Sequence, residues 1–510
     1  MGSGLQSASQ TSSDRRRWFA LGVLMAATFL DLVDVTIVNI AIPTIRQDIG
    51  ASFSAIQWIA GGYALAFALG LITGGRLGDI YGRKKLFLIG VAGFTITSVL
   101  CGLSPTAGAL VTSRVMQGAA AALMVPQVLS IIHVTFPPQE RGKVFGMFGA
   151  MIGLGGVMGP LIGALLTQWN LFGLEWRPIF LINLPVGVLA LYLGAKYISE
   201  SKAEHALRLD LVGVALATIG LALLLYPLTQ GRELGWPAWA FGSMIVGLAV
   251  LALFVGYERI KTRRDGSPLV ELSLFRIKSF SAGTVVQLTY GLVSGIFFLV
   301  WTLYMQLGLG WSPLKAGLTG IPFSIMAAVA AGISVQKLVP KFGRKVLQAG
   351  AVAQALGSVI YIWEASTLGA GIQPWHMALP LAIMGIGMGL IVAPITNTVL
   401  SEVPPAHSGS ASGLISTTNQ LGLAFGLGLV SVAFFNPLEG AFQAGDTTAG
   451  AFAVAFSSAM WYVAAGLLAI FFLVFALPRF APAWDTGDAA AGAPAGAGSG
   501  MDRQTESVTA

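Results

Sequence analysis

The chain has 510 residues, of which 55% are hydrophobic and only 10% are charged, and its formal net charge is +7 at pH 7. A soluble globular protein carries about 25% charged residues, so the composition excludes a soluble domain and indicates a polytopic membrane protein. The positive charge is typical of cytoplasmic loops and requires no nucleic-acid partner. The single cysteine, Cys101, excludes a disulfide within the chain and a cysteine-based metal site.

Long apolar segments recur along the whole chain. A membrane-spanning helix needs about 20 mostly apolar residues, and fourteen segments qualify, which predicts an all-α polytopic membrane protein. They cover residues 18–42, 55–76, 86–104, 107–132, 143–167, 178–197, 209–229, 238–257, 280–306, 316–338, 344–364, 376–400, 408–434 and 456–478. The first run follows a basic stretch but continues past Ile40 without a small-residue cleavage site, so we expect an uncleaved first span.

The distribution of Lys and Arg predicts the orientation of these spans. With the N-terminus in the cytoplasm, all but five of the 29 Lys and Arg residues fall in cytoplasmic loops and tails. The exceptions are Arg46, Arg177, Arg232 and Lys315 on the other side and Arg114 within a span. Because one missed span would invert every later loop, this bias supports an even number of spans with both termini in the cytoplasm.

A weak internal repeat divides the spans into two halves. Five glycines return 267 residues later: Gly118, Gly142, Gly146, Gly155 and Gly159 recur as Gly385, Gly409, Gly413, Gly422 and Gly426. Both members of each pair lie on the same side of the membrane, and parallel halves with a site between them are a transporter architecture. The predicted domains are a disordered tail (1–14), a six-helix half (15–200), two inserted helices (201–262), a second six-helix half (263–480) and a disordered Ala/Gly-rich tail (481–510).

The first span carries two acids, Asp31 and Asp34, at a spacing that places them on one helix face. A carboxylate in hydrocarbon costs at least a few kcal/mol, and such groups face a bundle interior or an aqueous cavity. Because desolvation favours the protonated form, the acids can carry a proton, or they can pair with a cation. The alternative is a structural acid that hydrogen-bonds a neighbouring helix. We favour function for Asp34 and leave both interpretations of Asp31 open.

Arg114 is the one basic residue predicted inside a span, and Gln117 lies one turn further along the same face. The buried charge needs a partner, for which a carboxylate of the first span is the obvious candidate. If proton binding weakens that pair, protonation can bias a helix rearrangement. A static pair that locks two helices together is the alternative.

Two glycine motifs complete the N-terminal half. The basic loop GRLGDIYGRKK (75–85) contains Gly75, Asp79, Gly82 and Arg83, and Asp79 could pair with a neighbouring helix end and latch one conformation. Without such a role, it is an ordinary cytoplasmic loop. The stretch GLGGVMGPLIGALL (153–166) forms a smooth face for close helix packing, with a bend at its proline. The residues of this face are Gly155, Gly159, Pro160 and Gly163.

No acidic residue is predicted well inside a span of the C-terminal half, where the polar side chains are neutral. Together with two residues of the first half, they are candidates for an aromatic and amide-lined substrate surface, although a satisfied interhelical hydrogen bond is the alternative for each. The candidates are Asn39, Gln117, Gln287, Tyr290, Trp301, Tyr304, Asn397, Asn419 and Gln420. The sequence has no P-loop, metal-ligand cluster or catalytic triad signature, so we expect no ATP hydrolysis, metal, cofactor or enzyme activity.

These motifs together resemble the major facilitator superfamily and, within it, the fourteen-helix drug:proton antiporter family. The stretches that carry the resemblance are DVTIVNIAIP (34–43) on the first helix, GRLGDIYGRKK (75–85) as motif A, RVMQGAAAA (114–122) as motif B, GGVMGPLIGA (155–164) as the antiporter motif and WRPIFLINLPVG (176–187). The chain departs from the family pattern at Ala164, where glycine is usual, and at Pro178, where an aromatic residue is common.

The resemblance implies a fold of two six-helix halves plus two inserted helices. It implies a proton-coupled antiporter that exports hydrophobic drugs or antibiotics across the bacterial cytoplasmic membrane by alternating access, driven by the proton motive force alone. Asp34 and Arg114 would belong to the coupling machinery, and Asp79 and Arg83 would form a cytoplasmic latch. We expect a small hydrophobic substrate, protons and membrane lipid as partners, and a monomer.

One difference from the family narrows the expected substrate. Some members hold dications with acids in the C-terminal half, and this sequence lacks them, so we expect a hydrophobic monocation, zwitterion or neutral compound. The alternatives are an exporter of lipid or endogenous metabolite, a proton-coupled nutrient importer and a non-transporting receptor on the same scaffold. The antiporter motif and the shortage of charged binding groups argue against import.

Overall fold

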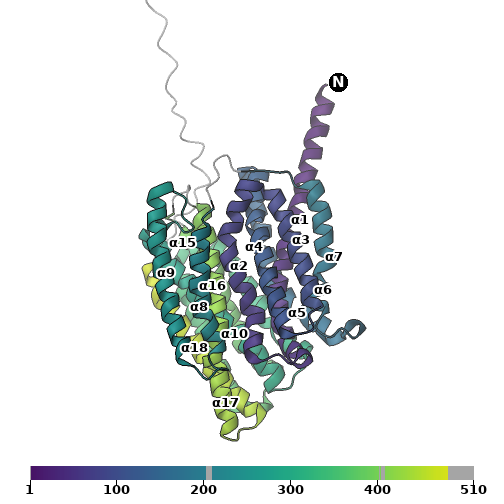
Figure 1. Ribbon diagram of the computed structural model, residues 1–510. Coiled ribbons are helices and arrows are strands. Elements are labelled where there is room, and N and C mark those ends of the chain that lie inside the picture. The colour runs from purple at the N-terminus through teal and green to yellow at the C-terminus, as the bar shows by residue number, and fades with distance from the viewer. Residues whose placement is uncertain (1, 203–208, 401, 404–407, 480–510) are drawn as a thin grey trace, which may run out of the picture.

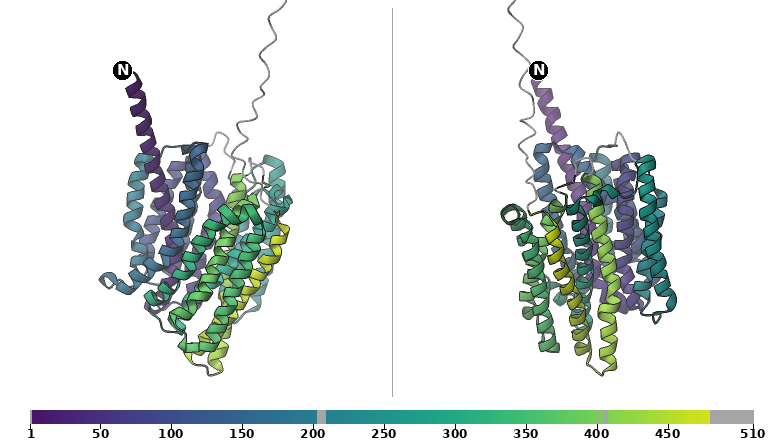
Figure 2. Two further views of the ribbon diagram at one scale, coloured as in Figure 1. Left: turned by 180° about the vertical axis from the view of Figure 1, so that it is seen from behind. Right: turned by 90° about the vertical axis from the view of Figure 1, so that its left-hand side faces the viewer.

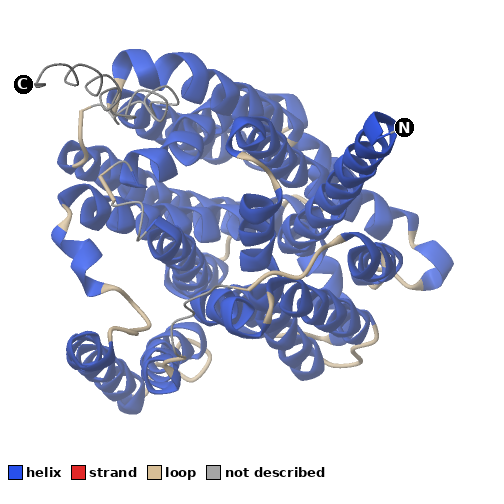
Figure 3. Cartoon of the chain, turned by 90° about the horizontal axis from the view of Figure 1, so that it is seen from above, coloured by secondary structure: helices blue, strands red, loops and turns tan. Residues whose placement is uncertain are grey.

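The protein is seen here as a computed structural model that describes residues 2–202, 209–400, 402–403 and 408–479. Side chains are described except for residues 2–15 and several within 138–157, 265, 396–400 and 408–412. Within these ranges every regular element is helical, and the helices run side by side as one bundle (Figures 1 and 3). The predicted C-terminal tail, 481–510, lies outside the described residues.

The helices follow the predicted spans closely. The N-terminal half contains α1 (Gly2–Ile49), α2 (Phe53–Tyr81), α3 (Arg83–Gly102), α4 (Ala107–Thr135), α5 (Pro138–Trp169), α6 (Pro178–Leu181) and α7 (Asn183–Tyr197). The inserted hairpin is α8 (Leu211–Gln230) and α9 (Ala238–Asp265). The C-terminal half contains α10 (Lys278–Leu303), α11 (Pro313–Thr319), α12 (Ile321–Ile333), α13 (Val339–Phe342), α14 (Lys345–Leu368), α15 (Pro374–Leu400), α16 (Ser408–Val430), α17 (Asn436–Gln443) and α18 (Thr448–Leu473).

The described residues form 13 helices that are long and apolar enough to cross a membrane. The remaining predicted span, 143–167, falls within α5, where some side chains are not described. The predicted all-α polytopic architecture is therefore confirmed. The longer spans contain π-helical turns, as at Tyr304–Gly308 and Ser431–Phe435.

The predicted disordered N-terminal tail is wrong for residues 2–14. Helix α1 begins at Gly2, and its first turns project beyond the rest of the bundle (Figures 1 and 2). Adding residues to an existing helix avoids the cost of nucleating a new one, so a span anchored in the bundle can extend into a polar segment even though Gly and Ser are weak helix formers.

The parallel repeat is visible in the close approach of equivalent helices. A Cβ added at Gly118 of α4 would lie 2.3 Å from the carbonyl oxygen of Tyr63 on α2. At the equivalent Gly385 of α15, a Cβ would lie 2.1 Å from the carbonyl oxygen of Phe323 on α12. Both helix pairs therefore touch backbone to backbone at a position where only glycine fits.

The two halves meet mainly at one end of the bundle. We call this end the distal face and the end that carries the N-terminus the terminal face (Figure 1). Near the distal face, the side-chain amide of Gln306 donates to the carbonyl of Ile40 on α1 at 2.8 Å. The amide of Gln57 on α2 donates to the carbonyl of Leu427 on α16 at 2.6 Å. These bonds tie α1 and α2 to the opposite half.

The inserted hairpin joins the same closure. Its turn, residues 231–237, lies at the distal face between α8 and α9. The Glu233 carboxylate accepts hydrogen bonds from the backbone N–H and the hydroxyl of Ser54, at 2.9 and 2.7 Å. The next residue back, Arg232, forms an ion pair with Glu439 of α17 at 2.6 Å. The turn therefore bridges the N-terminal and C-terminal halves.

The glycine contacts give a first prediction. Gly118→Ala and Gly385→Ala should each lower stability by at least about 1–3 kcal/mol, because the new methyl group overlaps a backbone oxygen. Thermal unfolding in detergent, followed by size-exclusion chromatography, measures the loss. Gly22→Ala is the matched control, because a Cβ there meets nothing within 4 Å, and it should be neutral or slightly stabilising. Equal melting of all three variants would contradict the close approach.

Candidate functional site: a buried charge network in the N-terminal half

The predicted pairing of Arg114 with the first span is present. Arg114 Nη1 lies 2.5 Å from Asp34 Oδ2, and the two side chains are 1% and 0% exposed. A buried ion pair of this kind must be well hydrogen-bonded to offset the loss of hydration of both charges. The remaining contacts of the pair meet that need.

Amide side chains complete the shell of Asp34. Its Oδ1 accepts hydrogen bonds from Gln117 Nε2 at 2.9 Å and from Asn183 Nδ2 at 3.0 Å. Asn183 also donates to the hydroxyl of Ser98 on α3 at 2.8 Å. Gln117 Oε1 accepts in turn from Arg114 at 2.6 Å. Both carboxylate oxygens of Asp34 are thus occupied by donors from α4 and α7.

The guanidinium of Arg114 is enclosed by α2 and α6. Its Nε donates to the carbonyl of Ile59 at 3.1 Å. Its planar face lies over the ring of Tyr63, 4.3 Å from the centroid, with the ring of Phe180 at 5.7 Å. Cation–π contacts of a desolvated arginine contribute about 2 kcal/mol. Side chains and backbone groups of α1, α2, α4, α6 and α7 therefore converge on the Asp34–Arg114 ion pair.

Asp31 is held differently from Asp34. The hydroxyl of Tyr63 donates to its Oδ1, and this is the one hydrogen bond to its side chain within the described part of the chain. The Asp31 side chain is 5% exposed. The site thus holds two buried carboxyl groups and one guanidinium, and the guanidinium is committed to Asp34. A second negative charge at Asp31 would be uncompensated, so a proton or a bound cation is needed there.

A glycine stripe on α5 fixes α1 from its other side. A Cβ at Gly159 would lie 1.8 Å from the hydroxyl oxygen of Thr36, and a Cβ at Gly155 would lie 2.8 Å from Leu32. Gly163 continues the stripe against Ile37. The predicted packing face is therefore present, and it presses α1 from the side that does not carry the acids.

Ala164, which stands where the family pattern usually has glycine, faces a glycine of the other half. Ala164 is fully buried, and its methyl carbon lies 2.8 Å from the point where a Cβ on Gly317 of α11 would sit. The extra methyl on α5 is therefore accommodated by a glycine on the facing helix. Pro160, which also lies on this surface, brings its carbonyl within 3.4 Å of the same point.

The basic loop between α2 and α3 lies at the terminal face. Asp79 and Arg83 pair with each other, with Oδ1 of the acid 2.8 and 3.0 Å from two guanidinium nitrogens. Gly82 between them has a φ of +115°, which explains its glycine. Glu200 accepts hydrogen bonds from the backbone N–H groups of Lys84 and Lys85, and thereby caps the start of α3.

The same loop region contacts the second half. Arg76, one turn before Asp79, donates to the carbonyls of Ser267 and Pro268 in the linker that leads from the hairpin to α10. Gly75 lies against Pro126 of α4. The loop thus lies against the linker to the second half, so a movement of one half relative to the other would change its contacts.

Comparison with known proteins now decides the family. Residues 24–427 match the description "Major Facilitator Superfamily". The chain belongs to this superfamily. It is 45% identical to the "Probable actinorhodin transporter" of Streptomyces coelicolor, over 83% of this chain and 73% of that protein. It is 35% identical to the "Tetracenomycin C resistance and export protein" of Streptomyces glaucescens, over 81% of this chain and 74% of that protein.

Solved structures agree on the fold. The crystal structure of a D-xylose-proton symporter matches 91% of this chain and 98% of its own, with a TM-score of 0.62 and 19% sequence identity. At that identity the likeness shows the major facilitator fold alone. The chain is thus a multi-pass membrane protein of a transporter superfamily.

The candidate substrate residues of this facilitator fall into separate groups. Gln117 belongs to the charge network. Tyr290, Trp301 and Tyr304 are buried within the C-terminal half, where the Tyr304 ring stacks on Phe456 of α18 at 4.6 Å. Gln287 is 8% exposed and lies on α10, which also carries Tyr290 and Trp301. The structure therefore does not bring the aromatic candidates together with Gln117.

The half-buried amides form the other group. Asn39, Asn419 and Gln420 make no side-chain hydrogen bond to any described residue, so their polar groups are free for a ligand or water. The side chain of Asn397 lies outside the described residues. Sequence reasoning missed Tyr63 and Asn183. The signal available for Asn183 was a lone amide in the apolar run IFLINLPVG.

The buried pair gives the second prediction. Asp34→Asn and Arg114→Gln should each lower stability by about 3–5 kcal/mol, because either change leaves one buried charge without its partner. The double variant should regain part of the loss, since it leaves no charge unpaired. Thermal unfolding of the four proteins forms a double-mutant cycle.

The control for this cycle is Glu140→Gln, which breaks the partly exposed Arg17–Glu140 pair at 2.9 Å. That change should cost no more than about 1 kcal/mol. Additive losses in the Asp34 and Arg114 double variant would contradict the coupling between these two residues.

Proposed function

We propose that this protein is a proton-coupled exporter of hydrophobic antibiotics or other drugs across the bacterial cytoplasmic membrane. It works by alternating access, with the terminal face in the cytoplasm and the distal face outside. The named relatives, one an actinorhodin transporter and one a tetracenomycin C export protein, support antibiotic export. The Lys and Arg bias supports the orientation.

The observation that carries the coupling is the unequal treatment of the two acids. Asp34 is saturated by Arg114, Gln117 and Asn183, whereas Asp31 has one donor, the hydroxyl of Tyr63. We therefore assign the exchanging proton to Asp31 and a positioning role to Asp34. Loss of the Asp31 proton creates a negative charge that a cationic substrate group can neutralise, which makes proton and substrate compete.

Alternating access requires the distal closure to open. Beside the apolar packing of α2 on α16 and of α5 on α11, the polar contacts across it are a few hydrogen bonds and the ion pair of the hairpin turn, each worth about 1 kcal/mol. A set of that size can break and re-form with a modest change in free energy. The α2–α3 loop with Asp79 and Arg83 is the matching device at the cytoplasmic end.

One observation favours a lipid exporter as the second candidate. An apolar crevice of about 370 Å³ lies between α2, α4 and α8, lined by Leu65, Leu69 and Val115 among others. An acyl chain would suit this lining. Retention of one defined lipid by the purified protein, displaced by neither drug nor acid, would favour that function over drug export.

The third prediction concerns proton release. Addition of a transported cationic or zwitterionic drug to the detergent-purified protein should release protons from wild type, and Asp31→Asn should release none while remaining folded. The reason is that Asp31 holds the exchangeable proton, whereas the neutral amide cannot ionise. A pH-indicator dye in weakly buffered solution records the release.

The discriminating control is Tyr63→Phe, which removes the donor to Asp31 but keeps the acid. It should still release protons, because the carboxyl group that carries the exchangeable proton is retained. Proton release that is unchanged in Asp31→Asn would show that another residue carries the exchangeable proton.

The fourth prediction concerns the hairpin turn. Glu233→Ala removes the hydrogen bonds to Ser54 and should shift the population toward the outward-open state by about fivefold, the equivalent of about 1 kcal/mol. In a Cys101→Ser background, a cysteine at buried Ser431 should then react faster with a membrane-impermeant maleimide added outside. Cysteine in place of exposed Phe172, which lies outside the closure, should label at an unchanged rate. Equal rates at position 431 with and without Glu233 would show that the turn does not hold the closure.

A further inference from the structure

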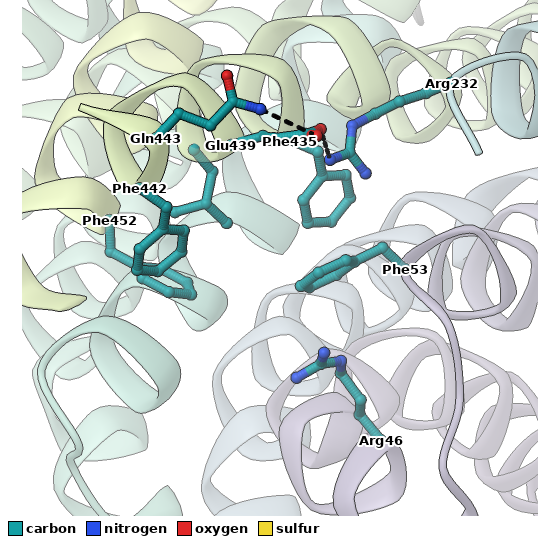
Figure 4. Close-up of a pocket in the computed structure, with 9 residues that line it drawn as sticks. Arg46, Phe53, Arg232, Phe435, Glu439, Phe442, Gln443 and Phe452 are labelled. Atoms are coloured by element: carbon teal, nitrogen blue, oxygen red, sulfur yellow. Dashed lines mark hydrogen bonds and ion pairs between the residues drawn. The ribbon is translucent and has the colours of Figure 1, made fainter. Parts of the chain in front are cut away.

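A second site lies at the distal face, away from the buried charge network. It is a pocket of about 600 Å³ between the ends of α1 and α2, the hairpin turn, α17 and α18 (Figure 4). Pockets for drug-sized molecules have volumes of about 300–1,000 Å³. Because its walls come from both halves, a molecule bound there spans the surface along which the halves must separate.

The pocket has one positive charge in excess. Its lining contains Arg46, Arg232 and Glu439. Glu439 is paired with Arg232 at 2.6 Å, whereas no carboxylate of the described chain lies within 4.0 Å of Arg46. The Nε of Arg46 is also buried without a hydrogen-bond partner. An arginine with unmet donors is a ready site for a carboxylate or another planar anion.

The nearby acids are engaged elsewhere. Asp48, two residues from Arg46, is paired with Arg177 at 2.8 Å. Glu233 accepts two hydrogen bonds from Ser54. Neither lies within 4.0 Å of Arg46, so the Arg46 guanidinium has no ion-pair partner in the described chain and can bind the anionic group of a ligand.

The remaining walls are aromatic. Phe53 and Phe435 lie with their centroids 4.2 Å apart, one from each half. Phe442 is 45% exposed, although it is a large apolar side chain on this rim. Figure 4 shows Phe442 and Phe452 across the pocket from Arg46 and Phe53. Ring faces and edges of this kind pack well against a planar apolar molecule.

We propose that this pocket is a distal binding site for planar aromatic carboxylates or phenolates on their way out. The proposal rests on the export function above and narrows its substrate class to molecules that carry a planar aromatic anion in addition to the cationic group that meets Asp31. The anionic group binds the guanidinium of Arg46, and the ring system packs between Phe435 and Phe442. A cationic aromatic compound is excluded here, because Arg46 repels it and already covers the Phe53 ring at 4.2 Å.

The test measures equilibrium binding of anthraquinone-2-carboxylate to the full-length protein in phosphatidylcholine nanodiscs. Equilibrium dialysis against empty nanodiscs corrects for partition into lipid. Wild type should bind the carboxylate at least tenfold more tightly than the neutral carboxamide, and Arg46→Gln should remove that preference. Glu439→Gln should tighten binding of the carboxylate about threefold, because it releases a second arginine in a solvent-accessible pocket.

The matched control is Lys315→Gln. Lys315 is another distal cation over a ring, 4.2 Å from the centroid of Trp311, but it does not line the pocket. Its removal should leave binding of the carboxylate unchanged. Arg46→Lys keeps the charge and loses the planar fork, so it should retain part of the preference.

Three outcomes would overturn the proposal. Equal binding of the carboxylate and the carboxamide would show that the pocket has no site for an anion. A fall in thermal stability of Arg46→Gln without a change in binding would show that Arg46 stabilises the end of its helix and does not bind the probe. Complete displacement of the probe by added phosphatidylglycerol at every probe concentration would assign the arginine to a lipid headgroup.

Asp31→Asn separates this proposal from the export function. The variant should bind the probe as wild type does, since Asp31 is remote from the pocket, while it loses proton-driven export. Export that persists without Arg46-dependent binding would support the export function and exclude the distal site. Arg46-dependent binding in a protein that exports no drug would support the distal site and exclude the export function.

Discussion

The buried ion pair of Asp34 and Arg114 is the constraint on which the N-terminal half depends. A charge in this position is tolerated only if every surrounding donor and acceptor is supplied by the protein. Helices α1, α2, α3, α4, α6 and α7 each provide one of those groups or an aromatic wall. The helices must also lie very close together, and the glycine stripe of α5 against Thr36 of α1 makes that possible. The hydrogen bonding of the ion pair and the close packing of the helices around it therefore depend on each other.

The two halves share a backbone repeat but differ in what they bury. Equivalent glycines at 118 and 385 bring equivalent helix pairs together, whereas the first half encloses charges and the second half encloses rings such as Tyr304 and Phe456. Each half is thus well packed within itself. The hydrogen bonds between them are few, and two of them run from a side-chain amide to a backbone carbonyl of the other half. Rigid halves joined by a small, reversible set of contacts are suited to rocking about a central site.

The sequence was sufficient to predict the spans, the repeat and the pairing of Arg114 with an acid of the first span, because charges in apolar segments are conspicuous and need each other. It was insufficient for Tyr63, Asn183 and Glu233. Each of these is locally ordinary, and its partner is far away in the chain, so only the packed bundle reveals the contact. The N-terminal tail failed for a different reason. Its composition lacks a core, but a helix already anchored in the bundle needs no core of its own to extend.

The inserted hairpin connects the contacts between the two halves with the distal pocket. Its turn holds Ser54 of one half and Glu439 of the other, and the same turn supplies Arg232 to the distal pocket. A bound anion that competes with Glu439 for Arg232 would loosen one of the two bridges that the hairpin turn makes across the distal face. The acid of the first span and the arginines of the distal face would then favour opposite ends of a zwitterionic aromatic molecule. A molecule carrying both charges would bind first through its cation beside Asp31 and later, in the distal pocket, through its anion beside Arg46, and its arrival at this second site would itself help to open the distal face.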